Sequence, residues 1–66
     1  MDPILNDYFA DCAAAALVDA ENYRAQGRRA KAQDSAQTAR YFAAKCTPQQ
    51  LPMDFETRVN AILSFR

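Results

Sequence analysis

Apolar residues recur along the first third of the chain at the three- and four-residue spacing of a helix, and acidic residues lie on the opposite side. Asp2 and Pro3 form a favourable helix start, because an N-cap acceptor precedes a proline at the first helical position. Gly27, the one glycine of the chain, is the natural C-terminal stop. The pattern therefore predicts a helix over residues 3–25. Its apolar stripe consists of Ile4, Leu5, Tyr8, Phe9, Cys12, Ala16, Ala20 and Tyr23.

A stripe of small residues predicts a second helix, over about residues 28–46. Two starts remain open, at Arg28 or at Asp34, where Gln37 three residues later forms a pair like a capping box. One continuous helix through Gly27 is disfavoured, because the apolar stripe of the first helix does not continue beyond the glycine. The small-residue stripe consists of Ala32, Ala36, Ala39, Ala43 and Cys46, with Phe42 beside it.

Residues 47–66 predict a short turn and then a third helix, over about residues 54–65. The segment Thr47-Pro48-Gln49-Gln50 resembles a capping box with a proline at the first helical position. Pro52 must interrupt the turn that this segment opens, because proline cannot continue a helix. Asp54 is then expected to cap the last helix. The apolar side of that helix carries Phe55, Val59, Ile62 and Leu63.

The three predicted helices define the fold class as all-α, an antiparallel helical hairpin plus a short C-terminal helix, in a single domain of residues 1–66. The composition agrees, because fourteen of the 66 residues are alanine and one is glycine. A chain of this length buries only about 60% of the surface that its unfolded state exposes, so its core is marginal by itself. Regular helix packing and self-association are the expected sources of further stability.

The two cysteines lie at equal distances from the predicted turn. Cys12 and Cys46 are centred on residue 29, so an antiparallel hairpin brings them to similar heights. The simpler interpretation is that both are small core residues. The alternative is a disulfide, which would close a long loop and contribute on the order of 3–4 kcal/mol to stability.

The chain has 8 basic and 8 acidic residues and no net charge, but the two signs lie in different parts of the sequence. Residues 1–23 contain five acidic residues and no basic residue, whereas residues 24–46 contain six basic residues and one acidic residue. Opposite charges favour the antiparallel pairing of these two helices, although each exposed pair contributes only about 0–1 kcal/mol. A second interpretation concerns the turn, where basic residues could contact phosphates or an acidic protein surface. These residues are Arg24, Arg28, Arg29 and Lys31.

The chain lacks the side chains on which most enzyme and metal sites depend. It has no histidine, one glycine and no C-x-x-C pair, which excludes Ser-His-Asp triads, glycine-rich phosphate loops and zinc motifs. Asp7 and Asp11 share a helix side, but such a pair is more often solvated than catalytic. We therefore expect no enzyme activity, no cofactor and no metal. The absence of a signal peptide and of a spanning apolar stretch predicts a cytoplasmic protein.

Apolar residues outside the predicted stripes favour a protein–protein interface. Leu17 and Val18 project from the back of the first helix, Tyr41 lies away from the alanine stripe, and Phe65 lies off the apolar side of the last helix. We therefore expect a small regulatory or inhibitory protein that binds a protein partner stoichiometrically, as a homodimer. An origin in a phage or another mobile element would suit such a protein.

Two other kinds of partner are less favoured. A nucleic-acid-binding module would use the basic segment 24–31, but a pI of 6.1 is low for such a domain. A membrane surface is disfavoured because the polar side of the first helix is acidic, which is the wrong sign for anionic lipids. Protein binding is thus the first hypothesis, and nucleic-acid binding is the alternative.

Overall fold

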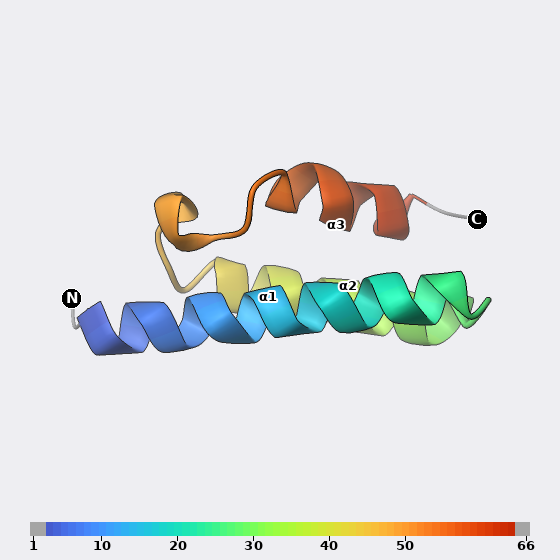
Figure 1. Ribbon diagram of the computed structural model, residues 1–66, viewed down its shortest axis with the longest axis horizontal. Helices are drawn as coiled ribbons and strands as arrows, with labels where there is room; N and C mark the ends of the chain where they lie inside the picture. Colours follow the sequence, from blue (N-terminus) through green and yellow to red (C-terminus); the bar gives the residue numbers. More distant parts are fainter. Residues whose placement is uncertain (1–2, 65–66) are drawn as a thin grey trace.

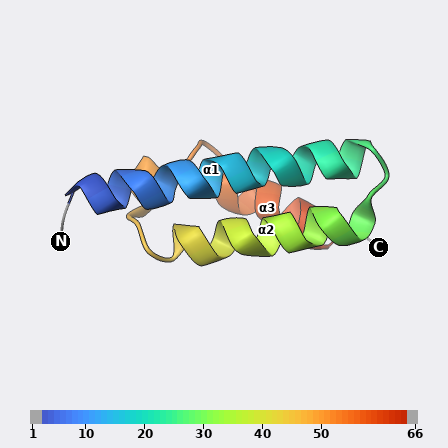
Figure 2. The same cartoon turned by 90° about the horizontal axis from the view of Figure 1, so that it is seen from below.

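The computed structural model shows an all-α molecule in which two long antiparallel helices pack against a short third helix (Figure 1). It describes the backbone of residues 3–64 and the side chains of residues 7–64. Seen from below, the two long helices lie side by side in front of the third (Figure 2). The predicted helical hairpin with a short C-terminal helix is therefore confirmed. The elements are α1 (Pro3–Ala25), α2 (Arg29–Ala43), the 3-10 turn η1 (Pro48–Gln50) and α3 (Phe55–Leu63).

Two hydrogen bonds around a glycine end α1 and reverse the chain. The amide of Gly27 donates to the carbonyl of Arg24 at 3.0 Å, and the amide of Arg28 donates to the carbonyl of Tyr23 at 2.9 Å. This pair of bonds is a Schellman motif, which satisfies carbonyls that a helix end leaves without partners. The motif requires a residue in the left-handed conformation, and Gly27 has φ +78°. The glycine stop is thus the turn of the hairpin.

Helix α2 begins at Arg29, with Arg28 in the N-cap position. The alternative start at Asp34 is wrong, because Asp34 lies inside the helix and its carbonyl accepts a hydrogen bond from the Thr38 hydroxyl at 3.0 Å. The guanidinium of Arg28 offers no acceptor, so its side chain makes no capping hydrogen bond to the first turn of α2. The turn at Gly27, rather than a cap, therefore fixes where α2 starts.

Helix α2 ends at Ala43, so the predicted end at Cys46 lies too far along the chain. Thr47 is extended (φ −80°, ψ 146°), which is the conformation favoured before a proline. Its hydroxyl donates to the side-chain oxygen of Gln50 at 3.2 Å and caps no backbone amide, so the predicted capping box is not formed. Gln50 Nε2 in turn donates to Asp7 Oδ1 at 2.6 Å, which ties η1 to α1.

Asp54 occupies the N-cap position of α3, but its side chain caps no amide. A capping side chain needs an extended backbone to reach the first amides of the helix. Asp54 is instead left-handed, with φ 60°, a conformation that aspartate tolerates better than most residues. The predicted cap at Asp54 is therefore wrong, although α3 begins at the next residue, Phe55. The cap predicted at Asp2 and the position predicted for Phe65 lie outside the described residues.

The core lies between the hairpin and α3, and it is built mostly from alanine. Short side chains allow α1 and α2 to pack closely, because the distance between helix axes depends on the residues at the contact. Leu17, Val59 and Ile62 have the largest fully buried side chains. Two of these three lie on α3, which therefore supplies much of the bulk that the hairpin lacks. The buried cluster consists of Ala13, Ala16, Leu17, Ala20, Ala32, Ala36, Ala39, Phe55, Val59 and Ile62.

The buried side of α1 differs from the stripe that the spacing predicts. Leu17 is 0% exposed and shares its side of the helix with Ala10, Ala13 and Ala20, whereas Tyr8 is 58% exposed. Helix α3 covers the hairpin from the side on which Leu17 lies, and spacing within one helix cannot reveal this contact. The prediction that Leu17 projects from the back of the helix is therefore wrong.

Replacing Gly27 with alanine should destabilise the protein by about 1–2 kcal/mol, because an L-residue is strained in the left-handed region. A Cβ at this position meets no atom within 4 Å, so the loss is conformational rather than steric. Gly27→Asn should lose less, since asparagine tolerates this conformation. Urea denaturation followed by circular dichroism measures all three proteins. Equal stability of Gly27→Ala and the wild type would contradict the Schellman turn.

Leu17→Ala should destabilise the protein by about 2–5 kcal/mol, because it leaves a cavity between the hairpin and α3. Val18 is 49% exposed, so Val18→Ala should change the stability by no more than about 0.5 kcal/mol. The same denaturation experiment compares the two variants. A loss at Leu17 as small as that at Val18 would restore the sequence-based prediction that both residues project from the back of the helix.

Candidate protein-binding surface

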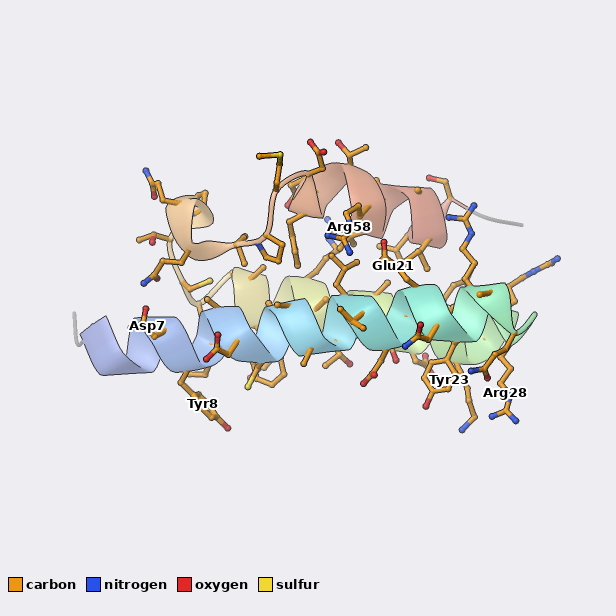
Figure 3. All side chains as sticks on the ribbon, viewed as in Figure 1. Asp7, Tyr8, Glu21, Tyr23, Arg28 and Arg58 are labelled. Atoms are coloured by element: carbon orange, nitrogen blue, oxygen red, sulfur yellow. The ribbon has the colours of Figure 1, made fainter. Side chains whose placement is uncertain are left out.

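The side of the hairpin that faces away from α3 carries exposed aromatic residues. Tyr8 and Tyr23 point away from α3, and Arg28, near the closed end of the hairpin, points the same way (Figure 3). Within the described chain, α3 and η1 both lie on the other side. We call this uncovered side the open face. Its aromatic and basic residues are Tyr8, Phe9, Tyr23, Lys31, Tyr41, Phe42 and Lys45.

Four aromatic rings form a continuous row across the open face, from α1 to α2. Tyr8 meets Phe9 edge-on at 5.5 Å between centroids, Phe9 stacks on Phe42 at 6.1 Å, and Phe42 meets Tyr41 edge-on at 5.4 Å. The ammonium of Lys45 lies 4.8 Å from the centroid of Tyr41 and 5.8 Å from that of Phe9. Tyr8 and Tyr41, the outer rings, are 58% and 61% exposed. The row is thus held in place by its inner rings and presents its outer ones.

Basic residues gather at the closed end of the hairpin, as the sequence predicts. Arg24, Arg28, Arg29 and Lys31 flank the turn and are all exposed, and we call this group the basic tip. The ammonium of Lys31 lies 5.8 Å from the centroid of Tyr23, within cation–π distance. The basic tip and the aromatic row lie at opposite ends of the hairpin, because Phe9 and Phe42 are far from the turn in both helices.

The three apolar residues predicted as contacts do not lie together. Tyr41 belongs to the open face, Leu17 is buried in the core, and Val18 is exposed elsewhere on α1. Val18 follows Tyr8 by ten residues, which turns it roughly 80° away around the helix. Spacing assigns Tyr8 and Phe9 to the core, because an aromatic stripe has the same period whether it is covered or exposed. Their position on the surface becomes evident only once α3 is placed.

An ion pair between Glu21 and Arg58 fastens α3 to α1 (Figure 3). Arg58 Nε donates to Glu21 Oε2 at 2.8 Å, and Arg58 Nη2 donates to Glu21 Oε1 at 2.5 Å. The hydrogen bond from Arg58 lowers the pKa of Glu21, partial burial opposes this effect, and the charges of Arg58 and Arg24 reinforce it. The sequence pattern misses this pair, because it places Glu21 only on a polar side of its helix.

Both cysteines are free and half-buried, so they are not joined and neither is a fully buried core residue. A side-chain hydrogen bond with the Cys12 thiol, followed by the thiol's charge and by burial, raises the pKa of the Tyr8 hydroxyl. Cys46 Sγ donates to the carbonyl of Ala43 at 3.5 Å, and burial raises the pKa of the Cys46 thiol. A raised thiol pKa disfavours the nucleophilic thiolate.

Among the described residues, no polar or charged side chain is buried. Within residues 7–64, no group of three or more His, Cys, Asp or Glu could hold a metal ion. Asp7 is hydrogen-bonded to Gln50, and Asp11 is exposed. A hollow of about 340 Å³ between α2, η1 and α3 is lined by alanine, proline and leucine together with Arg40 and Glu56. No helix in the described part of the chain has the length and apolar character needed to cross a membrane.

No family model matches the chain, and neither a curated protein nor a solved structure matches it. The features that can point to a function are therefore those of the chain itself. They are the open face with its aromatic row, the basic tip, and the distribution of charge along the two long helices.

Glu21→Gln should lower the stability at neutral pH by about 0–1 kcal/mol, because the ion pair is more than a third exposed and is screened by solvent. A lowered carboxyl pKa stabilises the fold above the unfolded value of about 4.3, and this contribution is lost as the pH falls through the folded pKa. The difference between wild type and variant should therefore shrink below about pH 4. Urea titrations between pH 3 and 7 test this, with the exposed Glu56→Gln as control. A difference that does not depend on pH would contradict the assignment.

Proposed function

We propose that the chain is a non-catalytic regulatory or inhibitory protein of the cytoplasm that acts by binding a protein partner stoichiometrically. The observation that carries this proposal is the open face, where Tyr8 and Tyr41 are more than half exposed on a preformed aromatic row. Tyrosine is enriched at protein interfaces, because its ring supplies contact area and its hydroxyl supplies a hydrogen bond.

The aromatic row suits binding because its side chains are already ordered. A side chain that becomes fixed on binding costs about 0.5–1.5 kcal/mol in lost conformational freedom. Tyr8 and Tyr41 each rest edge-on against an inner ring, and Lys45 lies over Tyr41. A partner that covers these rings therefore gains contact area at a reduced entropic cost. Because Tyr8 and Tyr41 are 58% and 61% exposed, burying them would remove on the order of 90–150 Å² per residue from water.

The basic tip provides a second, polar contact surface for an acidic region of the partner. Its four cations attract an acidic surface over a distance of about a Debye length and so increase the rate of association. The alternative function, nucleic-acid binding through segment 24–31, would use the same four cations. It would leave the aromatic row at the other end of the hairpin without a role, so we place it second.

Affinity capture from a lysate of the source organism tests the proposal with three baits: wild type, Tyr8→Ser/Tyr41→Ser and Arg28→Glu/Arg29→Glu. We expect the wild type to retain a protein that binds it stoichiometrically when both are purified, as measured by calorimetry. The tyrosine variant should weaken this binding at least about tenfold, since it removes two aromatic contacts at the interface. The charge reversal should weaken it to a smaller, salt-dependent extent.

Controls make this result specific to the open face. Asn22→Ser/Gln37→Ser changes two exposed polar residues and should bind like the wild type. Glutamates at the start of α2 complement the helix dipole, so the charge reversal should not unfold the protein. Retention of nuclease-sensitive nucleic acid that is lost with the charge reversal would favour the alternative. Equal binding of a protein by the wild type and the tyrosine variant would refute the role of the open face.

A further inference from the structure

We infer that a second copy of this chain occupies the open face, in a symmetric dimer whose twofold axis runs along the hairpin. The inference rests on the proposed function, in which the open face is the protein-binding surface, and it means that the second copy and the partner compete for this face. In this arrangement α1 of one copy lies against α2 of the other, and the two basic tips lie at the same end of the dimer. The result is a four-helix bundle of two stacked hairpins, with an α3 helix on each outer side.

The two halves of the open face carry opposite charges. Asp11 and Asp19 follow Tyr8 by three and eleven residues, and these spacings place them on or beside its side of α1. Lys31 and Lys45 on α2 hold their ammonium groups over rings of the open face. All four charged residues are exposed. Asp34, seven residues before Tyr41, is also exposed on this side of α2. The α1 half of the face is therefore acidic, and the α2 half has a net positive charge.

Charge decides between the two symmetric ways of joining these faces. In a face-to-face dimer the twofold axis lies in the plane of the interface, and it runs either across the hairpin or along it. An axis across the hairpin places α1 against α1, so the aspartates of the two copies face each other. An axis along the hairpin places the acidic helix of each copy against the basic helix of the other. Complementary charges favour the second arrangement and disfavour the first.

The heights of the charges along the hairpin also match. An axis along the hairpin leaves each residue at its own height. Lys45 lies beside Phe9, with its ammonium 5.8 Å from that ring, and Asp11 follows Phe9 by two residues, or about 3 Å. Asp11 of one copy therefore comes within reach of Lys45 of the second copy.

A second pair of charges meets near the basic tip. Lys31 lies beside Tyr23, 5.8 Å from its ring, and Asp19 precedes Tyr23 by four residues, or about 6 Å. Asp19 of one copy thus comes within reach of Lys31 of the second copy. Because the dimer is symmetric, each of the two pairs occurs twice.

The aromatic rows and the size of the face suit the same arrangement. The two rows meet at one end of the dimer, where Tyr8 of each copy lies about 3 Å from the height of Tyr41 of the other, because Phe9 stacks on Phe42. The Cα atoms of the molecule span 38 Å along the hairpin and 14 Å across its narrow direction. With side chains added, this footprint is comparable to the ~800 Å² per partner that a standard interface buries. A chain whose own core is small gains further burial in this way.

Charge reversal and mixing test the inference with purified protein alone. Asp19→Lys places two like-charged pairs in the symmetric dimer, and so does Lys31→Asp. Each variant should bind itself about tenfold more weakly than the wild type, as measured by sedimentation velocity over a concentration series. An equimolar mixture of the two variants pairs lysine with aspartate at both contacts, so it should recover the dimer. The double variant Asp19→Lys/Lys31→Asp should also recover it.

Each outcome supports or overturns the dimer. Circular dichroism of the variants, all at exposed helical positions, separates weaker association from unfolding. A monomeric wild type at tens of micromolar would overturn the inference, as would variants that dimerise like the wild type or a mixture that stays monomeric. A monomer that still binds a protein partner through Tyr8 and Tyr41 would leave the proposed function standing. Failure to bind any protein partner at concentrations at which the wild type is monomeric would instead refute the proposed function alone.

Discussion

The close contact of alanine against alanine between α1 and α2 is the constraint on which the rest of the structure depends. Alanine brings two helices together and fits helical geometry well, but it buries little apolar area, so the hairpin gains limited hydrophobic stabilisation of its own. The large side chains must come from elsewhere, and α3 supplies Val59 and Ile62. Leu17 is the large residue of the hairpin that meets them. The short third helix is therefore part of the core rather than an appendage.

The course of the backbone could be predicted where a single residue dictates local geometry. Gly27 ends α1 because its left-handed conformation costs a glycine little, and Pro48 keeps the preceding residue extended after α2 has ended. Caps were less predictable. Asp54 stands at the position expected of a cap, but its left-handed backbone turns the side chain away from the amides of α3. The local sequence predicts where a helix starts more reliably than it predicts which groups accept the hydrogen bonds of the first backbone amides.

The candidate surface could be predicted only in part, because exposure depends on which side of the hairpin α3 covers. Tyr41 and the basic tip lie on the surface, as their spacing indicates. Leu17 is buried although the pattern predicts that it is exposed, and Tyr8 is exposed although the pattern predicts that it is buried. The spacing of apolar residues shows which side of a helix is apolar, but it does not show which element packs against that side. The bond between Glu21 and Arg58 joins residues that are far apart in the sequence, and no local pattern encodes it.

The attachment of α3 implies a hierarchy of local stability within one small fold. The contacts between α1 and α2 follow one another outward from the turn that joins the two helices. Helix α3 is held by a few buried residues and by one bidentate ion pair at the surface. Short-range contacts form early in folding because they close small loops, and elements with fewer contacts open at lower free energy than the whole molecule. Helix α3 is therefore the unit expected to open first. Its opening would uncover the alanine seam and Leu17, and would leave an apolar groove on the side opposite the aromatic rings.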